Sequence, residues 1–323
     1  MPVVLVTGGA GYVGSHAVLE LLPHFQVIVF DNLSRGHRRL VPAGAEFIQG
    51  NLHDTARLAD MMQSRRVEAV LHFSAYAYVG ESVADPGLYF SNNVAGTLSL
   101  LEAMRQAGVQ RLIFSSSCTV YGLPQSNPIH EDHPLAPISP YGQSKLMMEQ
   151  ILPAYEQAHG LRFFVLRYFN AAGCDAQGRS GELHDPEPHV IPRLLLAAQG
   201  RLPHFGILGD RHATPDGTCI RDYVHVTDLA VAHRQALQLL LDGHQSTTCN
   251  LGTGHGFSVR ELIQAAEMVT GRSITVRIEP PRPGDPAGLV ADARRARTIL
   301  GWSPSHSSLP EILSSAWRWQ QSQ

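Results

Sequence analysis

A tyrosine and the only lysine of the chain stand four residues apart, in the run Tyr141-Gly-Gln-Ser-Lys145. The chain has 25 lysine and arginine residues, so a position that keeps ammonium instead of guanidinium needs its compact charge and three rotatable donors. Positions i and i+4 of a helix share a face, so the phenol and the ammonium can enter one pocket. A neighbouring cation favours phenolate and lowers the pKa of a tyrosine from about 10. The spacing predicts a tyrosine tuned for proton transfer.

A run of serines, Ser115-Ser116-Ser117, stands at the end of an expected strand over 111–115. Open α/β sheets bind ligands at the C-terminal ends of their strands. A serine hydroxyl placed there can hydrogen-bond a substrate oxygen and share its proton with a phenol. Strand-end capping would explain the serines alone. Together with Tyr141 and Lys145, they predict a catalytic site.

A glycine pattern follows the first apolar run of the chain. Residues 2–7 predict a buried strand, and Gly8, Gly11 and Gly14 lead into an apolar helical stretch over 13–22. Glycines let the backbone turn tightly and approach a pyrophosphate. The start of the helix offers free N–H groups and a positive dipole end to the anion. This arrangement predicts a dinucleotide-binding turn.

A second apolar strand, 26–30, ends in Asp31. An acidic residue there accepts hydrogen bonds from the adenosine ribose and repels the 2′-phosphate of NADP. A turn cap is the structural alternative. Arg35, Arg38 and Arg39 could favour NADP, but they follow the acidic residue and fit a solvated loop. We therefore expect NAD.

Strand and helix patterns alternate through the first half of the chain. The expected strands continue near 46–49, 69–73, 111–115 and 162–169, and the expected helices lie near 55–64, 92–108 and 141–159. Such alternation predicts an α/β fold with a Rossmann-type, doubly wound parallel sheet.

A change of residue composition after Asn170 predicts a second domain. Prolines interrupt the chain there, so we expect an NAD-binding domain over 1–170 and a smaller α/β substrate-binding domain over 171–323. A helix over 228–241 and a strand near 249–251 would return to the first domain, as segments near 222–252.

The composition limits the function classes. With 44% hydrophobic and 16% charged residues, the chain can bury a sizeable core, and a net charge of −3 gives no reason to expect nucleic acid or a membrane surface as partner. No apolar run approaches the ~18 residues of a membrane span, and no targeting signal precedes the first strand. The four cysteines lack paired spacing and predict reduced thiols in a cytoplasmic protein. The 17 histidines are scattered, so we expect no metal site.

These segments together resemble the extended short-chain dehydrogenase/reductase family, and within it the nucleotide-sugar 4-epimerases. Beyond the serine run, the motifs that carry the resemblance are Val6-Thr-Gly-Gly-Ala-Gly-Tyr-Val-Gly14, Asp31-Asn-Leu, His72-Phe-Ser-Ala, Val79-Gly-Glu-Ser82, Asn92-Asn-Val-Ala-Gly-Thr97, Ser139-Pro-Tyr-Gly-Gln-Ser-Lys145, Arg167-Tyr-Phe-Asn170, Pro215-Asp-Gly-Thr-Cys-Ile-Arg-Asp-Tyr223 and Arg282-Pro-Gly-Asp285. They extend almost from end to end of the chain.

The resemblance implies roles for individual residues. Tyr141 would remove the O4 proton of the sugar, Lys145 would hold the nicotinamide ribose and lower the tyrosine pKa, and Ser117 would hydrogen-bond O4. Implied cofactor contacts are Gly8, Gly11, Tyr12, Val13, Gly14, Asp31, Asn32, Asn51, Leu52, Phe73, Asn93, Tyr141, Lys145 and Phe169. Implied substrate contacts are Ser117, Tyr141, Asn170, His189, Arg221, Arg282, Asp285 and Leu289.

The implied activity interconverts UDP-galactose and UDP-glucose through a transient 4-keto sugar, with NAD as a prosthetic group. The resemblance also implies a homodimer, formed through the helices near 92–108 and 141–159. Leu289 is intermediate in size at a position that lines the pocket near the 2-substituent of the sugar, so UDP-N-acetylhexosamine stays open as a substrate. UDP-pentose and UDP-uronic acid also stay open, because 4-epimerases share the core chemistry.

Two departures and two alternatives accompany this hypothesis. Asn51 stands where aspartate is common, and Ala77 and Tyr78 stand where some members place a cofactor-binding lysine. A nucleotide-sugar dehydratase would need an acidic pair directly after the strand-end serine, where this chain has Cys118 and Thr119. A cofactor-bound sensor without catalysis could dispense with the tyrosine and lysine, which this chain keeps.

Overall fold

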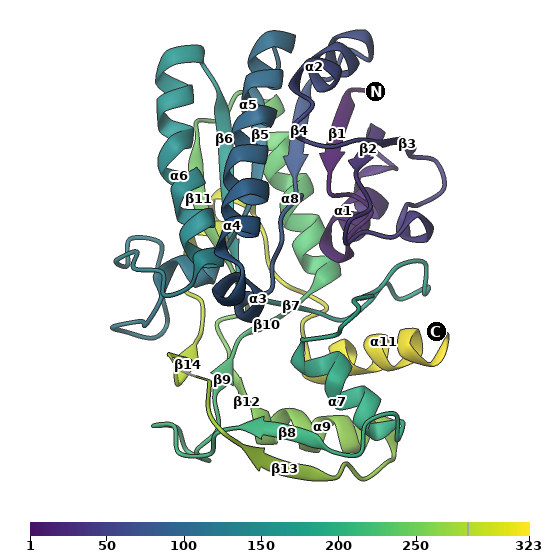
Figure 1. Ribbon diagram of the computed structural model, residues 1–323, viewed down its shortest axis with the longest axis vertical. Coiled ribbons are helices and arrows are strands. Elements are labelled where there is room, and N and C mark those ends of the chain that lie inside the picture. The colour runs from purple at the N-terminus through teal and green to yellow at the C-terminus, as the bar shows by residue number, and fades with distance from the viewer. Residues whose placement is uncertain (283) are drawn as a thin grey trace.

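The computed structural model describes residues 1–282 and 284–323. Seven parallel strands form the main sheet, in the order β11-β6-β5-β4-β1-β2-β3 (Figure 1). Their bounds are β1 (Val3–Thr7), β2 (Gln26–Asp31), β3 (Glu46–Gln49), β4 (Ala69–His72), β5 (Arg111–Ser117), β6 (Arg162–Tyr168) and β11 (Thr247–Leu251). The expected Rossmann-type sheet is confirmed.

Helices cover both faces of this sheet (Figure 1). On one face lie α1 (Tyr12–Leu21), α8 (Val226–Leu241) and α10 (Arg294–Leu300), and on the other lie α2 (Thr55–Ser64), α5 (Gly96–Ala107) and α6 (Pro140–His159). The helix expected over 92–108 is divided: a π-helix, η2 (Phe90–Ala95), precedes α5. Short helices connect these elements: η1 (Arg38–Leu40), α3 (Val79–Ala84), α4 (Pro86–Tyr89) and η3 (Cys118–Tyr121).

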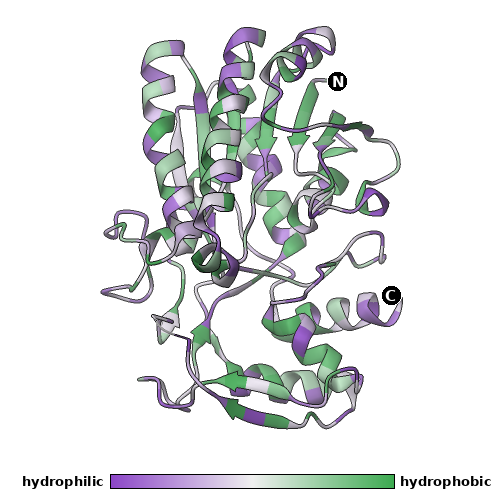
Figure 2. Ribbon diagram, in the orientation of Figure 1, coloured by the Kyte–Doolittle hydropathy of each residue, from purple (hydrophilic) through white to green (hydrophobic). Residues whose placement is uncertain are grey.

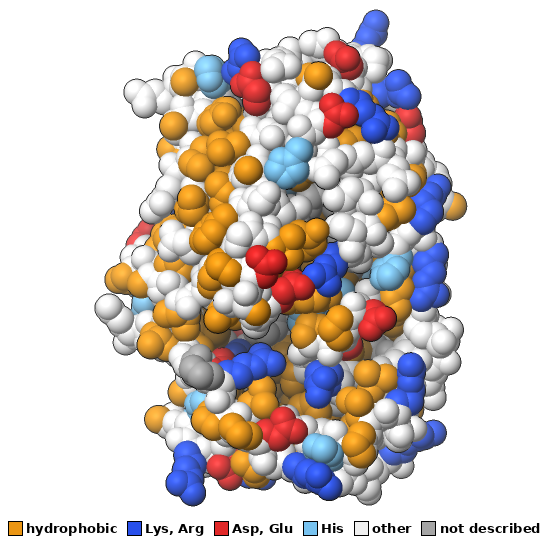
Figure 3. Space-filling model, in the orientation of Figure 1, with side chains coloured by type: hydrophobic (Ala, Val, Ile, Leu, Met, Phe, Trp, Pro, Cys, Tyr) orange, Lys and Arg blue, Asp and Glu red, His pale blue; other side chains and the backbone are white. Residues whose placement is uncertain are grey.

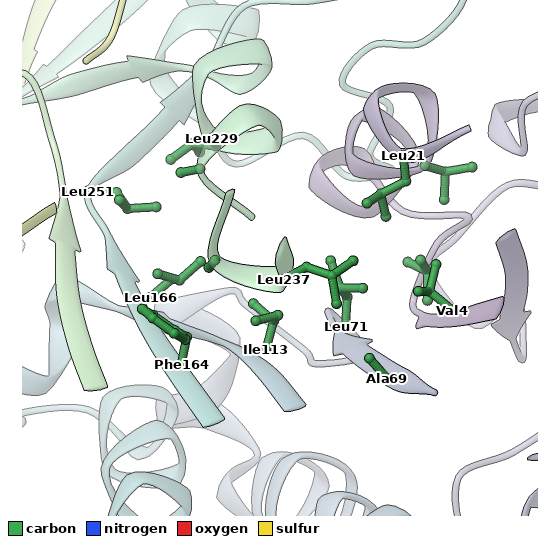
Figure 4. Close-up of a cluster of buried hydrophobic side chains, with 14 of the residues drawn as sticks. Val4, Leu21, Ala69, Leu71, Ile113, Phe164, Leu166, Leu229, Leu237 and Leu251 are labelled. Carbon is green, nitrogen blue, oxygen red and sulfur yellow. The ribbon is translucent and has the colours of Figure 1, made fainter. Parts of the chain in front are cut away.

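Apolar side chains from strands and helices fill the space on each side of the sheet. Figure 4 shows the cluster between the sheet and α1 and α8, where Leu237 lies beside the strand residue Leu71 and Leu21 lies on the side of Val4. The hydropathy colouring in Figure 2 shows the strands of the main sheet as largely hydrophobic, as expected for strands buried on both faces. Ala296, Leu300 and the fully buried Trp302 belong to the same cluster, so the stretch around α10 also packs on the main sheet.

A smaller part lies at the C-terminal edge of the main sheet and has its own core between α7, α9 and α11. Its elements are β7 (Asn170–Ala172), α7 (Val190–Ala198), β8 (Phe205–Leu208), β9 (Ile220–Arg221), β10 (Tyr223–His225), β12 (Phe257–Ser258), α9 (Val259–Thr270), β13 (Val276–Glu279), β14 (Gly288–Leu289) and α11 (Leu309–Gln321). The strands form small sheets of two or three members. Among the described residues, no helix combines the length and the apolar character needed to cross a membrane.

Candidate active site

The turn between β1 and α1 brings backbone atoms so close together that side chains are excluded. A Cβ on Gly14 would lie 2.2 Å from the Gly8 carbonyl oxygen, and Gly8 itself has a φ of +74°. Helix α1 begins at Tyr12 behind Gly11, without a side-chain cap. Its first N–H groups are therefore free for an anion, as a dinucleotide pyrophosphate requires.

A buried carboxylate lines the same cleft. Asp31 ends β2 and accepts hydrogen bonds from the Ala10 N–H (3.1 Å) and the Leu33 N–H (2.8 Å). Burial raises its pKa, while these two donors oppose the shift. The lining of the cleft includes seven residues with expected cofactor contacts, which are Gly8, Gly11, Asp31, Asn32, Asn51, Leu52 and Phe73.

Other expected cofactor residues lie around this cleft in separate settings. Asn93 is buried in η2, donates to the Tyr76 carbonyl (3.0 Å) and contacts the Ser144 hydroxyl (3.0 Å), so it joins two sides of the site. Tyr12 is also buried, and its hydroxyl donates to the Gly173 carbonyl (2.5 Å) of the smaller part. Val13 is partly buried in the first turn of α1, and Phe169 is buried directly after β6.

Tyr141 and Ser117 meet because α6 starts close to the end of β5. Ser139 caps α6 by accepting a hydrogen bond from the Gly142 N–H. A Cβ on Gly142 would lie 2.7 Å from the Thr119 carbonyl oxygen, so glycine permits this approach. Both Tyr141 and Ser117 are 7% exposed. The Ser117 oxygen accepts hydrogen bonds from the N–H and the hydroxyl of Thr119.

The pKa of Tyr141 moves in the direction opposite to the one expected from its spacing to Lys145. Burial raises this pKa above its usual value of 10, Tyr168 adds to the shift, and the Ser117 hydroxyl opposes it. The Lys145 ammonium donates to the Ser115 carbonyl (2.7 Å) and lies over the Phe114 ring. The expected lowering is therefore wrong for this structure, because desolvation of the phenol dominates.

A buried ion pair stands behind Lys145. Glu149, one turn along α6, accepts three hydrogen bonds from the guanidinium of Arg167 and one from the Ser116 hydroxyl. Burial lowers the pKa of Lys145 to about 8, although Glu149 raises it. The sequence shows that Glu149 follows Lys145 by four residues. Only the packing of α6 on β6 shows that Arg167 is the partner of Glu149.

Three residues that are expected to contact the substrate, Arg221, Asp285 and Leu289, lie together in the smaller part. Arg221 in β9 pairs with Asp285 (2.5 Å), and its neighbour in the parallel register is Leu289, which is buried in β14. Arg282 is exposed, and its carbonyl accepts a hydrogen bond from the Asp285 N–H.

Two further expected contacts lie where the chain enters the smaller part. Asn170 begins β7 and donates its N–H to the Asp222 carbonyl. His189 stands just before α7, between Glu182 and Glu187. Partial burial disfavours the charged imidazole, yet the pKa of His189 is raised to about 10 because both carboxylates flank it.

Comparison with known proteins identifies the family. The model of the NAD dependent epimerase/dehydratase family matches residues 4–252. The chain belongs to this family. A curated UDP-glucose 4-epimerase from Rhizobium leguminosarum bv. trifolii is 50% identical over 318 residues, which cover 98% of this chain and 96% of that protein. The resemblance drawn from the motifs is confirmed.

Solved structures of epimerases match the whole architecture. UDP-glucose 4-epimerase from Brucella ovis in complex with NAD superimposes with a TM-score of 0.96 at 48% identity, covering 98% of each chain. The enzyme from Bifidobacterium longum in complex with NAD+ and UDP gives a TM-score of 0.93 at 38% identity, covering 99% of this chain and 98% of that one. The glycine turn, the free start of α1 and the buried Asp31 fit NAD, the cofactor named for this epimerase/dehydratase family.

Sequence reasoning missed a connection across the cleft. Arg35 follows β2 and pairs with Glu81 of α3, and its guanidinium lies over the rings of Tyr76 and Tyr78 at 5.3 and 5.2 Å. In Figure 3, acidic and basic side chains stand side by side across the middle of the visible face. The sequence analysis assigned Arg35 to a solvated loop, since nothing local indicates a partner 46 residues away.

Proposed function

We propose that the protein interconverts UDP-galactose and UDP-glucose by inverting C4, with NAD as its resident prosthetic group. The observation that carries this proposal is the joint burial of Tyr141 and Ser117 at the C-terminal edge of the sheet. The near-full-length similarity to UDP-glucose 4-epimerases supports it.

In this proposal Tyr141 is the group that takes the proton from O4 of the sugar and later returns it. When bound, NAD supplies the acceptor and donor of the C4 hydride. Ser117 holds O4 and shares the proton with the phenol. The buried phenol is protonated at rest, so forming the phenolate needs a nearby positive charge. We assign that role to the ammonium of Lys145.

The residues proposed to bind the cofactor are assigned from their positions in and around the cleft. The free N–H groups of α1 at Tyr12 and Val13 bind the pyrophosphate, and Asp31 with Asn32 binds the adenosine ribose. Asn51 and Leu52 flank the adenine. Phe73, Asn93 and Phe169 line the path toward the nicotinamide. Because Gly8, Gly11 and Gly14 have no side chains, the backbone of the turn can approach the pyrophosphate closely.

The nucleotide of the substrate binds on the smaller part. Arg221 and Arg282 are assigned to the diphosphate, because a guanidinium pairs phosphate oxygens through two parallel hydrogen bonds. Asp285 orients Arg221. Asn170 and His189 are assigned further contacts with the uridine diphosphate. Holding the nucleotide and leaving the hexose less restrained lets the 4-keto sugar turn its other face before the hydride returns.

The identity of the sugar distinguishes the proposed activity from those of other nucleotide-sugar 4-epimerases. Leu289 is buried beside Arg221 in the small sheet, at the position assigned to the 2-substituent. A leucine there permits hexoses and leaves N-acetylhexosamines, pentoses and uronic acids as second candidates. A dehydratase is disfavoured, because Cys118 and Thr119 follow Ser117 and neither supplies the acid and base that elimination of water needs.

We also propose that two copies associate through α5 and α6. Leu98, Met147, Ile151 and Tyr155 on these helices are only partly buried, and Figure 3 shows hydrophobic side chains gathered on that side of the molecule. Sedimentation at micromolar concentration should give a dimer, and Ile151→Glu should shift it to monomer. For the compartment we propose the cytoplasm, in line with four free, buried cysteines.

The first experiment uses purified protein with no added cofactor. It is incubated with UDP-galactose, and UDP-glucose formation is followed by sugar analysis together with the NAD content of the protein. Turnover without added NAD supports the proposal. Absence of turnover in protein that carries NAD would refute the galactose substrate and direct the search to the other nucleotide sugars.

A further inference from the structure

We propose that Glu182, His184, Glu187 and His189 bind one divalent transition metal ion of the Zn2+ type. These residues precede α7 and take no part in the proposed proton transfer, although His189 is also assigned to the nucleotide of the substrate. Their ligand atoms all lie within 4.8 Å of one another. Two imidazoles and two carboxylates are a donor set that suits Zn2+ and its neighbours in the first transition row.

The four side chains form a ring in which nitrogen and oxygen alternate. The His189 Nδ1 lies 2.7 Å from Glu182 Oε1 and 2.9 Å from Glu187 Oε1. The His184 Nδ1 lies 3.3 Å from Glu182 Oε1 and 3.5 Å from Glu187 Oε2. A tetrahedral ion with bonds of about 2.0 Å requires ligand atoms about 3.3 Å apart. The four observed nitrogen–oxygen distances, 2.7 to 3.5 Å, lie on either side of that value. Small side-chain rotations would therefore bring the four ligand atoms to the spacing of a tetrahedral site.

A second observation points into the same ring. The Nδ1 of His184 is buried and has no partner of acceptable hydrogen-bond geometry in the described part of the chain, although it faces both carboxylates. Leaving a buried polar nitrogen without a hydrogen bond is unfavourable, because its lost hydration is not replaced. A metal bond to this nitrogen would remove that cost.

The surroundings restrain the ligands and leave an entry route. The rings of Tyr12 and Tyr78 stand edge-on to the His184 ring, and the Glu187 carboxylate also accepts from the His189 N–H at 2.8 Å. The His189 side chain is 42% exposed, so an ion can reach the ring from solvent. Four protein ligands leave no open position, which is typical of structural sites. The ion would fasten the start of α7 next to the start of α1.

The sequence alone did not indicate this site. Its four members lie within the eight residues Glu182-Leu-His-Asp-Pro-Glu-Pro-His189, whereas the histidines of the whole chain are scattered. Only the path of the segment through its two prolines brings the four ligand atoms together.

The test measures metal binding and stability in the NAD-loaded protein, independently of epimerase activity. Protein stripped with EDTA and dialysed is titrated with Zn2+ by calorimetry, and the bound zinc is counted by mass spectrometry. We expect one equivalent per chain and a higher midpoint of thermal unfolding. His184→Gln and Glu187→Gln should each lose the equivalent. His204→Gln, which alters a histidine–carboxylate pair elsewhere in the fold, should keep it.

Two results would overturn the proposal: wild-type protein that binds no zinc, or His184→Gln protein that binds as much as wild type. If a variant does not fold, the wild type decides through Co2+, whose visible spectrum distinguishes four-coordinate from six-coordinate ions. An octahedral spectrum, or none above free Co2+, counts against the site. Because no readout depends on turnover, failure of the metal site and failure of the proposed activity are separable.

Discussion

Replacing Glu149 with glutamine should destabilise the protein strongly. The side chains of Glu149 and Arg167 are only 5% and 6% exposed, and the arginine also donates to the Tyr121 hydroxyl and the Glu131 carbonyl. Glutamine keeps the shape but removes the charge, so the guanidinium remains buried without its counter-ion. Breaking a buried pair in this way costs about 3–5 kcal/mol. Because the amide retains one acceptor, we expect about 3 kcal/mol.

The assay is urea unfolding of NAD-loaded protein at one fixed NAD concentration, since bound ligand adds to stability. The matched control is Glu102→Gln, which removes the same charge from a pair with Arg105. That pair is 38–44% exposed, and exposed pairs contribute little to stability because solvent screens the charges. Equal losses for the two variants, or a loss below about 1 kcal/mol for Glu149→Gln, would refute the reasoning from burial.

Three further predictions concern the active site. Because burial lowers the pKa of Lys145 to about 8 and Glu149 opposes that shift, turnover should fall as the pH rises through about 8, where the ammonium loses its proton. The fall should begin at lower pH in Glu149→Gln, and a flat wild-type profile across about pH 7–9 would contradict this. Gly14→Ala, whose Cβ would lie 2.2 Å from a backbone oxygen, should purify with little NAD. The control Gly80→Ala, with nothing within 4 Å of the added carbon, should retain its NAD. Equal NAD contents in the two variants would count against the glycine turn as the pyrophosphate site. Leu289→Ser should raise kcat/KM for UDP-N-acetylglucosamine relative to UDP-glucose by about tenfold, and an unchanged ratio would remove Leu289 from the sugar pocket.

The sequence predicted those parts of the fold whose residue pattern is long and periodic. The strands of the main sheet and α6 appear close to their expected positions, because buried parallel strands and a twenty-residue helix impose strong patterns on their residues. The strands β9, β12 and β14 have two residues each, too few to show any period. The π-helix η2 lies inside a continuous helical pattern, so periodicity could not separate it from α5.

Side-chain partners that are distant in sequence were harder to predict. The spacing of Tyr141 and Lys145 placed both near the site, but burial of each group, which spacing does not report, set the direction of both pKa shifts. The partner of Arg35 and the packing of Trp302 on the main sheet likewise depend on the folded chain. The ring of Glu182, His184, Glu187 and His189 is local in sequence, yet its shape depends on the turn that holds it.

The most direct test of the central claim compares wild-type and Tyr141→Phe proteins in the conversion of UDP-galactose to UDP-glucose, with the bound NAD measured in both. The change removes one hydroxyl from a buried side chain and leaves the glycine turn and Asp31 untouched, so NAD should remain bound. General acid–base catalysis contributes about 10²–10⁴-fold to a rate, and we predict that the variant loses activity by this factor. A Tyr141→Phe protein that keeps its NAD and turns over within about tenfold of the wild type would contradict the account.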